Sequence, residues 1–270
     1  MDFIDKLKER SEALGAVAEA CQYILRNDEV ASEARDYLDT RLSRSAQDKY
    51  GFGYFPDDDS LKFLFSLASR ELLESEGLVY RSFVGMGHHL HGHFSKHNLV
   101  CPLRDVHGNI SALLGRTLLS DSERERLELK KYKYTRGYSS NLYLFGLNLA
   151  KETIIEKDYV ICVEGQLDCI ACQEAGIMNV VALGKASLSR YQFSRLHRYT
   201  NNIFLMLDND EPGQEGKRII KAHYLPFGNV KSISVPNGYK DIDEFLRKEG
   251  SHTWRQTVIN GLSALQPKES

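Results

Sequence analysis

The sequence predicts an α/β fold in which a parallel sheet is flanked by helices, preceded by an α+β region in the first half of the chain. Short, apolar, β-rich runs recur in the second half, at residues 159–163, 179–183 and 203–207, and a fourth strand is expected at residues 230–235. Segments with helical spacing separate these runs, and this alternation is typical of parallel strands buried on both faces of a sheet. The first half differs, because helical stretches there precede a β-hairpin.

The N-terminal elements begin with an amphipathic helix. Apolar residues recur at three-, four- and seven-residue steps over residues 3–26, which is the spacing of one helix face. Further helices are expected over residues 31–42 and from Asp59 or Ser60, either of which can cap a helix, through Leu72.

A β-hairpin is predicted over residues 98–119, because two apolar runs enclose a polar turn at residues 105–109. The polar residues 120–140 that follow are expected to be mobile. A histidine cluster precedes the hairpin and comprises His88, His89, His91, His93 and His97. It is interpreted as a mobile glycine–histidine loop, with a metal site as the alternative, because structural zinc sites usually include cysteine.

The helices of the second half lie between the apolar runs. Helical spacing extends from the first run to Gly176, and further helices are expected at about 189–199 and 214–223. The expected organisation has three parts: an α+β subdomain with a basic surface, a parallel-sheet domain, and a short helical tail. Their bounds are 1–150, 151–250 and 251–270.

The composition is that of an ordinary globular protein. The chain has 270 residues, a formal net charge of −2, and 27% charged residues. No apolar run reaches the ~20 residues of a membrane helix. The charge disfavours a protein that simply coats nucleic acid, but it allows an acidic site beside a local basic surface. Five scattered cysteines without a disulfide-like framework indicate a reducing cytoplasm.

Four carboxylates follow two of the predicted strands. Glu164 comes directly after the first apolar run, and Asp168 lies about one helical turn further. Asp208 and Asp210 come directly after the third run. Because ligands of such sheets bind beyond the carboxyl ends of the strands, the four acids can converge on one point and hold Mg²⁺ or Mn²⁺. Any one of them alone is better explained as a helix cap or a solvated loop residue.

Two motifs formed by these acids resemble those of the TOPRIM domain, a metal-binding fold shared by primases, topoisomerases and some nucleases. Residues 163–168, Val-Glu-Gly-Gln-Leu-Asp, resemble its Glu-Gly-x-x-Asp motif. Residues 208–213, Asp-Asn-Asp-Glu-Pro-Gly, resemble its Asp-x-Asp-x-x-Gly motif. The resemblance implies a TOPRIM domain with a divalent-cation site.

Flanking segments narrow the resemblance to DnaG-type primases, in the family's order over about residues 5–250. They are residues 34–38 with 50–54, 102–105 with 114–116, 133–134 with 144–147, and 240–248. The chain is similar to the RNA-polymerase core of that family, without its N-terminal zinc ribbon and C-terminal helicase-binding domain. It departs from the family at Tyr132, where a proline is usual, and at Asn98, where an arginine is common.

The resemblance implies an enzyme that makes short RNA primers on single-stranded DNA with two or more Mg²⁺ or Mn²⁺ ions and no zinc. It assigns the metal site to Glu164, Asp168, Asp208, Asp210, Asp241 and Asp243, with the first four as catalytic acids. The partners it implies are a DNA template, ribonucleoside triphosphates, and a replicative helicase or a separate zinc-ribbon subunit. The expected place is the cytoplasm, at the nucleoid or replisome, with no membrane association.

Contacts with nucleic acid or nucleotide are expected from Arg104, Arg116, Lys130, Lys131, Lys133, Tyr134 and Lys185. In residues 130–138 basic residues alternate with tyrosines. The basic side chains can bind phosphates and the tyrosines can stack on nucleobases, although a solvated loop would have the same composition. Lys185 is equally well explained as an exposed loop lysine.

Two other functions stay open at this point. A TOPRIM nuclease would use the same acids and metals, and the primase-like segments disfavour it. A non-catalytic subunit that binds single-stranded nucleic acid would not need the complete set of acids.

Overall fold

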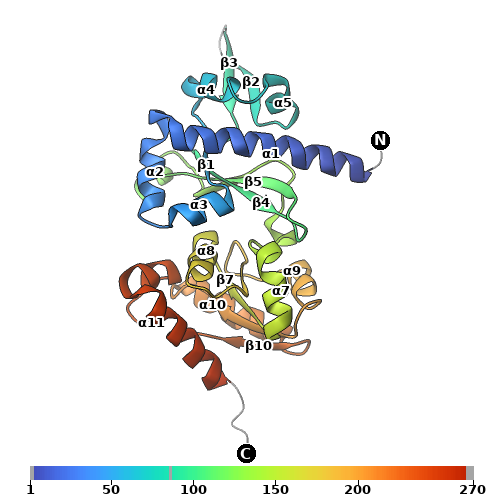
Figure 1. Ribbon diagram of the computed structural model, residues 1–270, viewed down its shortest axis with the longest axis vertical. Helices are drawn as coiled ribbons and strands as arrows, with labels where there is room; N and C mark the ends of the chain where they lie inside the picture. The colour runs from blue at the N-terminus through green and yellow to red at the C-terminus, as the bar shows by residue number, and fades with distance from the viewer. Residues whose placement is uncertain (1–2, 85–86, 266–270) are drawn as a thin grey trace, which may run out of the picture. The chain divides into compact units, whose positions relative to one another are not determined.

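The computed structural model describes residues 3–84 and 87–265, and the chain divides into two compact units (Figure 1). The first comprises Met1–Arg104 and Gly108–Tyr138, and the second comprises Asp105–His107 and Ser139–Ser270. This division falls earlier than the boundary expected at residue 150, because α7 (Leu147–Lys157) packs on the sheet of the second unit. Within the described residues, no helix combines the length and apolar character needed to cross a membrane.

The first unit is built on an antiparallel sheet with the strand order β1-β4-β5-β6. The strands are β1 (Gly53–Tyr54), β4 (Leu99–Arg104), β5 (Ile110–Arg116) and β6 (Tyr132–Tyr134). Strands β4 and β5 confirm the predicted hairpin. The long helix α1 (Phe3–Asn27) packs against this sheet through buried residues such as Leu14, Val17 and Cys21, which confirms the predicted amphipathic helix.

Short helical segments follow α1 up to residue 75. They are η1 (Glu29–Ala31), α2 (Ser32–Asp39), α3 (Arg44–Tyr50), η2 (Asp58–Ser60), α4 (Leu61–Phe65) and α5 (Arg70–Ser75). The single helix expected through Leu72 is wrong, because Ser69 starts a new helix by accepting a hydrogen bond from the Leu72 N–H at 3.2 Å. The sequence analysis also missed α3, which begins where the Ser43 hydroxyl caps the Ala46 N–H.

The polar segment after the hairpin has regular structure, so its expected mobility is wrong. Helix α6 (Asp121–Arg126) starts with a capping box, in which Ser120 Oγ accepts from the Glu123 N–H and Glu123 Oε2 accepts from the Ser120 N–H. Strand β6 then joins the sheet, with Lys133 opposite Gly115 of β5. Helix capping and strand pairing therefore order a segment that composition alone assigned to a loop.

Most of the histidine cluster also lies in regular structure, which corrects its interpretation as a mobile loop. Strands β2 (Val79–Val84) and β3 (Gly87–Gly92) form an antiparallel pair. His91 is held on both sides, with Nδ1 2.7 Å from Asp58 Oδ2 and Nε2 2.7 Å from Ser82 Oγ. The side chain of His88 lies outside the described residues.

The second unit has a fully parallel sheet with the strand order β10-β9-β7-β8, which confirms the predicted α/β class. The strands are β10 (Asn229–Ser232), β9 (Asn202–Met206), β7 (Val160–Val163) and β8 (Val180–Ala182). The helices are η3 (Ser140–Leu142), α7, α8 (Gln166–Glu174), α9 (Arg190–Leu196), α10 (Glu211–Tyr224) and α11 (Ile242–Leu265). Helix α11 runs through the expected boundary at residue 250, where Gly250 interrupts it with a non-helical φ of 80°.

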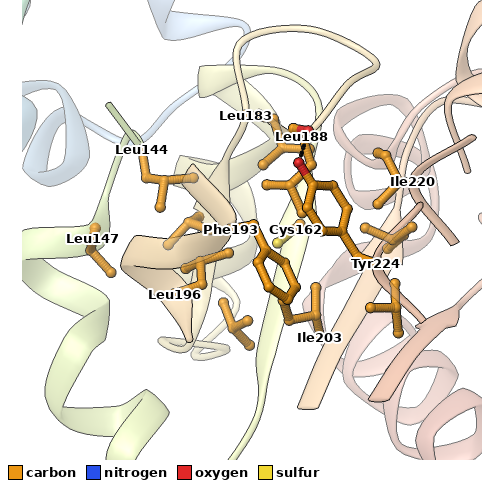
Figure 2. Packing of buried hydrophobic residues seen from close by; sticks show 14 of the residues in the cluster. Leu144, Leu147, Cys162, Leu183, Leu188, Phe193, Leu196, Ile203, Ile220 and Tyr224 are labelled. Carbon is orange, nitrogen blue, oxygen red and sulfur yellow. Dashed lines mark hydrogen bonds between the residues drawn. The ribbon is translucent and has the colours of Figure 1, made fainter. Parts of the chain in front are cut away.

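Both faces of the parallel sheet are covered by helices. On one face, α7, α9 and α10 bury residues such as Leu147, Phe193 and Tyr224 against the strands (Figure 2). On the other face, α8 and α11 bury residues such as Cys172 and Trp254. Neighbouring strand residues alternate between the two clusters, so the sheet is apolar on both sides and its polar groups are concentrated at the strand ends.

Candidate functional site

Two neighbouring strands deliver the first acids to one edge of the parallel sheet. Val163 of β7 is paired in register with Met206 of β9. Glu164 follows Val163 directly, and Asp208 lies two residues after Met206. Because parallel strands end at the same edge, the chain leaves the sheet with these carboxylates close together.

The electrostatics bring the other acids into the same neighbourhood. Burial, followed by the charges of Asp208 and Asp210, raises the pKa of Glu164 to about 7. Burial, followed by the charges of Asp208, Asp241 and Asp243, raises the pKa of Asp168 to about 8. Since such effects decrease with distance, the six acids predicted from the sequence share one region of the second unit.

Hydrogen bonds place the last two acids of this group. The Asp243 N–H donates to Asp168 Oδ1 at 3.2 Å. Asn209, between the two acids that follow β9, donates from Nδ2 to the carbonyl oxygens of Val235 and Tyr239 at 3.1 and 2.9 Å. The segment after β10 is thereby tied to the ends of both β7 and β9. In the sequence motif Asn209 occupies only a variable position, so this role was not predicted.

Several of the acids accept backbone hydrogen bonds. Asp210 Oδ1 caps α10 by accepting from the Gly213 N–H at 2.9 Å, and Asp241 Oδ1 accepts from the Glu244 N–H at 2.8 Å. Gly213 allows a close approach, because a Cβ there would lie 2.3 Å from the Asp208 carbonyl oxygen. Asp210 is therefore a helix cap, as the alternative interpretation expected, and it also lies in the same region as the other acids.

The donor set fits a divalent cation. Among the described residues, no three His, Cys, Asp or Glu side chains are already spaced as metal ligands. However, Glu164 Oε2 is buried and has no hydrogen-bond partner within the described part of the chain. Clustered carboxylates repel one another, and hard oxygen atoms are the ligands that Mg²⁺ and Mn²⁺ prefer. The acids therefore suit such an ion once their side chains rearrange to meet it.

Lys217 also belongs to this neighbourhood, and the sequence analysis missed it. Its side chain is buried, with Nζ 3.4 Å from the Asp208 carbonyl oxygen. Burial lowers the pKa of Lys217, and the charges of Asp208, Asp210 and Glu164 oppose that effect. The signal in the sequence was its position on the buried face of α10, in step with Gly213, Ile220 and Tyr224.

Lys185, the expected phosphate contact of the second unit, has a different partner. Its Nζ forms a hydrogen bond with Asn141 Oδ1, in the segment of η3. The ammonium group of Lys185 is therefore directed to an amide oxygen of that segment rather than to the carboxylates.

The two arginines of the expected nucleic-acid surface lie in the first unit and have partners there. Arg104 donates to the Gly108 carbonyl oxygen at 2.9 Å, across the turn of the β4–β5 hairpin. Arg116 donates to the Tyr132 hydroxyl at 2.9 Å, and its guanidinium lies 4.9 Å from the ring centre of Tyr37.

The basic segment Lys130–Tyr134 joins the same sheet through β6, where Tyr132 is paired with Arg116, whereas Arg104 is paired with Ile110 at the other end of β5. Lys130 and Lys131 are exposed, whereas burial, followed by the charge of Arg136, lowers the pKa of the half-buried Lys133. The ring of Tyr134 stacks on that of Tyr138, with centroids 4.9 Å apart.

Two buried histidines hold this basic segment in place. The Nε2 atoms of His93 and His97 lie 2.8 Å from the carbonyl oxygens of Tyr134 and Lys130, respectively. Burial lowers the pKa of both rings, so they are neutral donors at physiological pH. These histidines thus support the chain at both ends of the segment. The histidine cluster is visible in the sequence, but this role was not predicted.

Comparison with known proteins identifies relatives of both units. A family model described as Toprim-like matches residues 161–246. A DNA primase of Clostridium acetobutylicum is 32% identical over 269 residues, which include 96% of this chain. The chain spans 43% of the length of that relative.

Solved structures show the same fold over nearly the whole chain. The zinc-binding and RNA-polymerase domains of the Aquifex aeolicus primase match with a TM-score of 0.76 and 26% identity, covering 96% of this chain and 62% of that one. The RNA-polymerase domain of Mycobacterium tuberculosis primase DnaG matches with a TM-score of 0.75 and 25% identity, covering 93% of this chain and 83% of that one.

Proposed function

Because the chain belongs to the family of DnaG-type primases and matches their RNA-polymerase core, we propose that it synthesises short RNA primers on single-stranded DNA by divalent-metal-dependent nucleotidyl transfer. The observation that carries the proposal is the convergence of six acids from three segments of the second unit. With divalent cations bound, such a centre can neutralise phosphate charge, which is the main requirement of phosphoryl transfer.

The cofactor follows from the family and the donor set. The family suggests dependence on divalent metal, and the oxygen ligands favour Mg²⁺ or Mn²⁺, with two or more ions bound. When bound, such ions lower the pKa of the primer 3′-hydroxyl and neutralise the leaving pyrophosphate. Glu164, Asp168, Asp208 and Asp210 would hold them, with Asp241 and Asp243 completing the set.

The chain's own residues position the reactants. Asn209 ties the loop after β10 to the end of β9, and the Asp243 N–H ties the start of α11 to Asp168 of α8, so the six carboxylates stay in one place. Catalysis then consists of orientation and charge neutralisation, and it needs no nucleophilic side chain.

Nucleic acid would be bound by basic and aromatic side chains of the first unit. Lys130 and Lys131 offer exposed charges to the phosphates of single-stranded DNA, and Arg104, Arg116 and Lys133 add to this surface. The stacked rings of Tyr134 and Tyr138 offer a platform for a nucleobase. Lys185 would contact a nucleotide phosphate after releasing Asn141.

The wider role is replication. The partners would be ribonucleoside triphosphates, a single-stranded template, and a replicative helicase or a separate zinc-ribbon subunit. The place of action would be the cytoplasm, at the nucleoid or replisome.

One assay tests the proposal. The protein is incubated with single-stranded DNA, labelled ribonucleotides and Mg²⁺ or Mn²⁺, and the products are separated by size. Short RNA supports a primase. Degraded DNA would indicate a nuclease, and a gel shift without either product would indicate a binding subunit.

A double variant, Asp208→Asn with Asp210→Asn, is the matched control for this assay. Asparagine can still cap α10, so the fold is retained while the charges are removed. RNA synthesis at the wild-type rate by this variant would contradict the proposed mechanism.

A further inference from the structure

Lys217 is a positive charge buried beside the acids. Its side chain is 6% exposed, and the charges of Asp208, Asp210 and Glu164 act on it. Lysine is almost never buried to this degree unless it is paired, so these acids are its counter-charges. The sequence motifs of the metal centre do not include it.

Close backbone packing sets the position of Lys217. A Cβ at Gly216 would lie 2.2 Å from the Ala186 carbonyl oxygen, and one at Gly213 would lie 2.3 Å from the Asp208 carbonyl oxygen. Helix α10 is therefore packed directly against the backbone at two points on the face that carries Lys217. The Nζ donates to the Asp208 carbonyl oxygen at 3.4 Å, which directs the ammonium group toward the acids.

Two other full positive charges act on acids of this group, Lys240 on Glu164 and Arg247 on Asp243, but both belong to exposed residues, whereas Lys217 is buried. Asp210 and Asp168 accept from backbone N–H groups. Glu164 Oε2 has no hydrogen-bond partner among the described residues. A full positive charge nearby lowers the repulsion between these carboxylates more than a backbone dipole does.

We propose that Lys217 is a built-in counter-cation of the acidic centre. It holds Glu164 and the Asp208–Asp210 pair together before metal binds, and it weakens metal binding until a nucleotide arrives. The triphosphate supplies negative charge that offsets the lysine, so metal and nucleotide are expected to bind together. This inference rests on the proposed function, because it requires that the acids bind divalent cations.

The test removes the charge and keeps a polar side chain. In Lys217→Gln, a neutral amide replaces the ammonium group on a side chain that is one atom shorter. We expect this variant, without DNA or nucleotide, to bind Mn²⁺ on the order of three- to tenfold more tightly than the wild type, because a like charge has left the site. We also expect its Tm in EDTA to fall, and saturating Mn²⁺ to restore it to that of the wild type with Mn²⁺.

Two matched variants separate charge from packing. Lys217→Arg keeps the positive charge and should retain the Mn²⁺ affinity of the wild type within about twofold. Lys221→Gln removes an exposed lysine one turn further along α10 and should change neither Mn²⁺ affinity nor Tm. Mn²⁺ affinity is measured by electron paramagnetic resonance, and Tm by calorimetry.

Unchanged or weaker Mn²⁺ binding by Lys217→Gln would overturn the proposal. A lysine with only a structural role would lower Tm equally with and without Mn²⁺. If Lys217→Gln does not fold, Lys217→Met takes its place. Failure of both to fold in saturating Mn²⁺ also counts against the proposal, since the metal should replace the missing charge.

The proposed function is tested separately, because none of these measurements depends on RNA synthesis. If Lys217→Gln binds Mn²⁺ more tightly but the wild-type protein makes no RNA, the role of Lys217 is supported and the primase function is refuted. If the wild-type protein makes RNA but Lys217→Gln has unchanged Mn²⁺ affinity, the primase function is supported and the role of Lys217 is refuted.

Discussion

Asp168 Oδ1 accepts a hydrogen bond from the backbone N–H of Asp243 at 3.2 Å, although the two residues are 75 positions apart. Asp168 lies in the first turn of α8, and Asp243 lies in the first turn of α11. This bond joins the segment after β7 to the segment after β10. Its N–H group offsets part of the cost of burying the Asp168 carboxylate, while Asp208, Asp241 and Asp243 raise that cost.

Replacing Glu164 by glutamine should have opposite effects on stability and activity. At pH 8, above its raised pKa of about 7, the wild-type side chain is charged and repelled by Asp208 and Asp210. Glu164→Gln removes that repulsion, so Tm in EDTA should rise while primer synthesis is lost. Calorimetry and the primer assay measure the two effects. Glu156→Gln, an exposed change on α7, is the control, and a Tm that falls in Glu164→Gln would contradict the prediction.

The stability of the metal-free protein should decrease as pH rises. Burial, followed by neighbouring charges, raises the pKa values of Glu164 and Asp168 to about 7 and about 8, from ordinary values of 4.5 and 3.8. Between the ordinary and raised values the folded state holds more protons than the unfolded state, so the free energy of unfolding falls from about pH 4 to about pH 8. Urea titrations in EDTA across this range measure it.

Two comparisons identify the groups responsible for this pH dependence. The double variant Glu164→Gln with Asp168→Asn should show a smaller decrease, because both titrating carboxyls are gone. Saturating Mg²⁺ should also reduce the decrease, since it stabilises the ionised acids. An equal slope in the wild type and the double variant would assign the effect to other groups.

Removing the Asn209 side chain should loosen the loop that carries the last two acids. Asn209→Ala leaves the carbonyl oxygens of Val235 and Tyr239 without this donor, which should cost about 1–3 kcal/mol of unfolding free energy. Mn²⁺ affinity should fall as well, because Asp241 and Asp243 are less well placed. Asn201→Ala, at an exposed position before β9, is the control, and wild-type Mn²⁺ affinity in Asn209→Ala would refute the role of the loop.

Neutralising the basic segment should weaken DNA binding through charge. In the triple variant Lys130→Ala, Lys131→Ala and Lys133→Ala, affinity for single-stranded DNA should fall. The slope of log K against log salt should become shallower by about 0.7 for each DNA phosphate that the variant no longer neutralises. Fluorescence anisotropy at several salt concentrations measures both quantities. The same net charge is removed by changing Lys8, Lys157 and Lys221, which are exposed elsewhere, and equal weakening by that control would refute a local surface.

The two supporting histidines should affect DNA binding in another way. His93→Ala or His97→Ala removes a donor to the carbonyl oxygen of Tyr134 or Lys130, which should cost about 1–3 kcal/mol of stability. Affinity for single-stranded DNA should fall because the segment is less ordered, while the salt slope stays near that of the wild type because the lysines remain. His89→Ala, at an exposed position of β3, is the control, and unchanged affinity in both variants would show that the segment needs no such support.

The elements that sequence patterns predicted well are those defined by local periodicity. The alternation of β-rich runs and helices located β7, β8, β9 and β10. The runs of β7, β8 and β9 are apolar because these strands are buried on both faces, whereas the edge strand β10 also contains Lys231 and Ser232. The same reasoning failed for residues 120–140, where composition indicated a mobile loop. A capping box at Ser120 and pairing of β6 with β5 order that segment, and strand pairing depends on a partner that local composition does not reveal.

The sequence by itself determined which acids end the strands and which motifs they form, because the order of residues after a strand is a local property. Only the tertiary structure decided that the Asp243 N–H meets Asp168, that Lys217 is buried among the acids, and that His93 and His97 hold the basic segment. These relationships depend on desolvation and on hydrogen bonds between separate segments of the chain, and packing sets both. The helical spacing of α10 indicates that Lys217 is on the buried face, but it does not indicate which groups surround the ammonium.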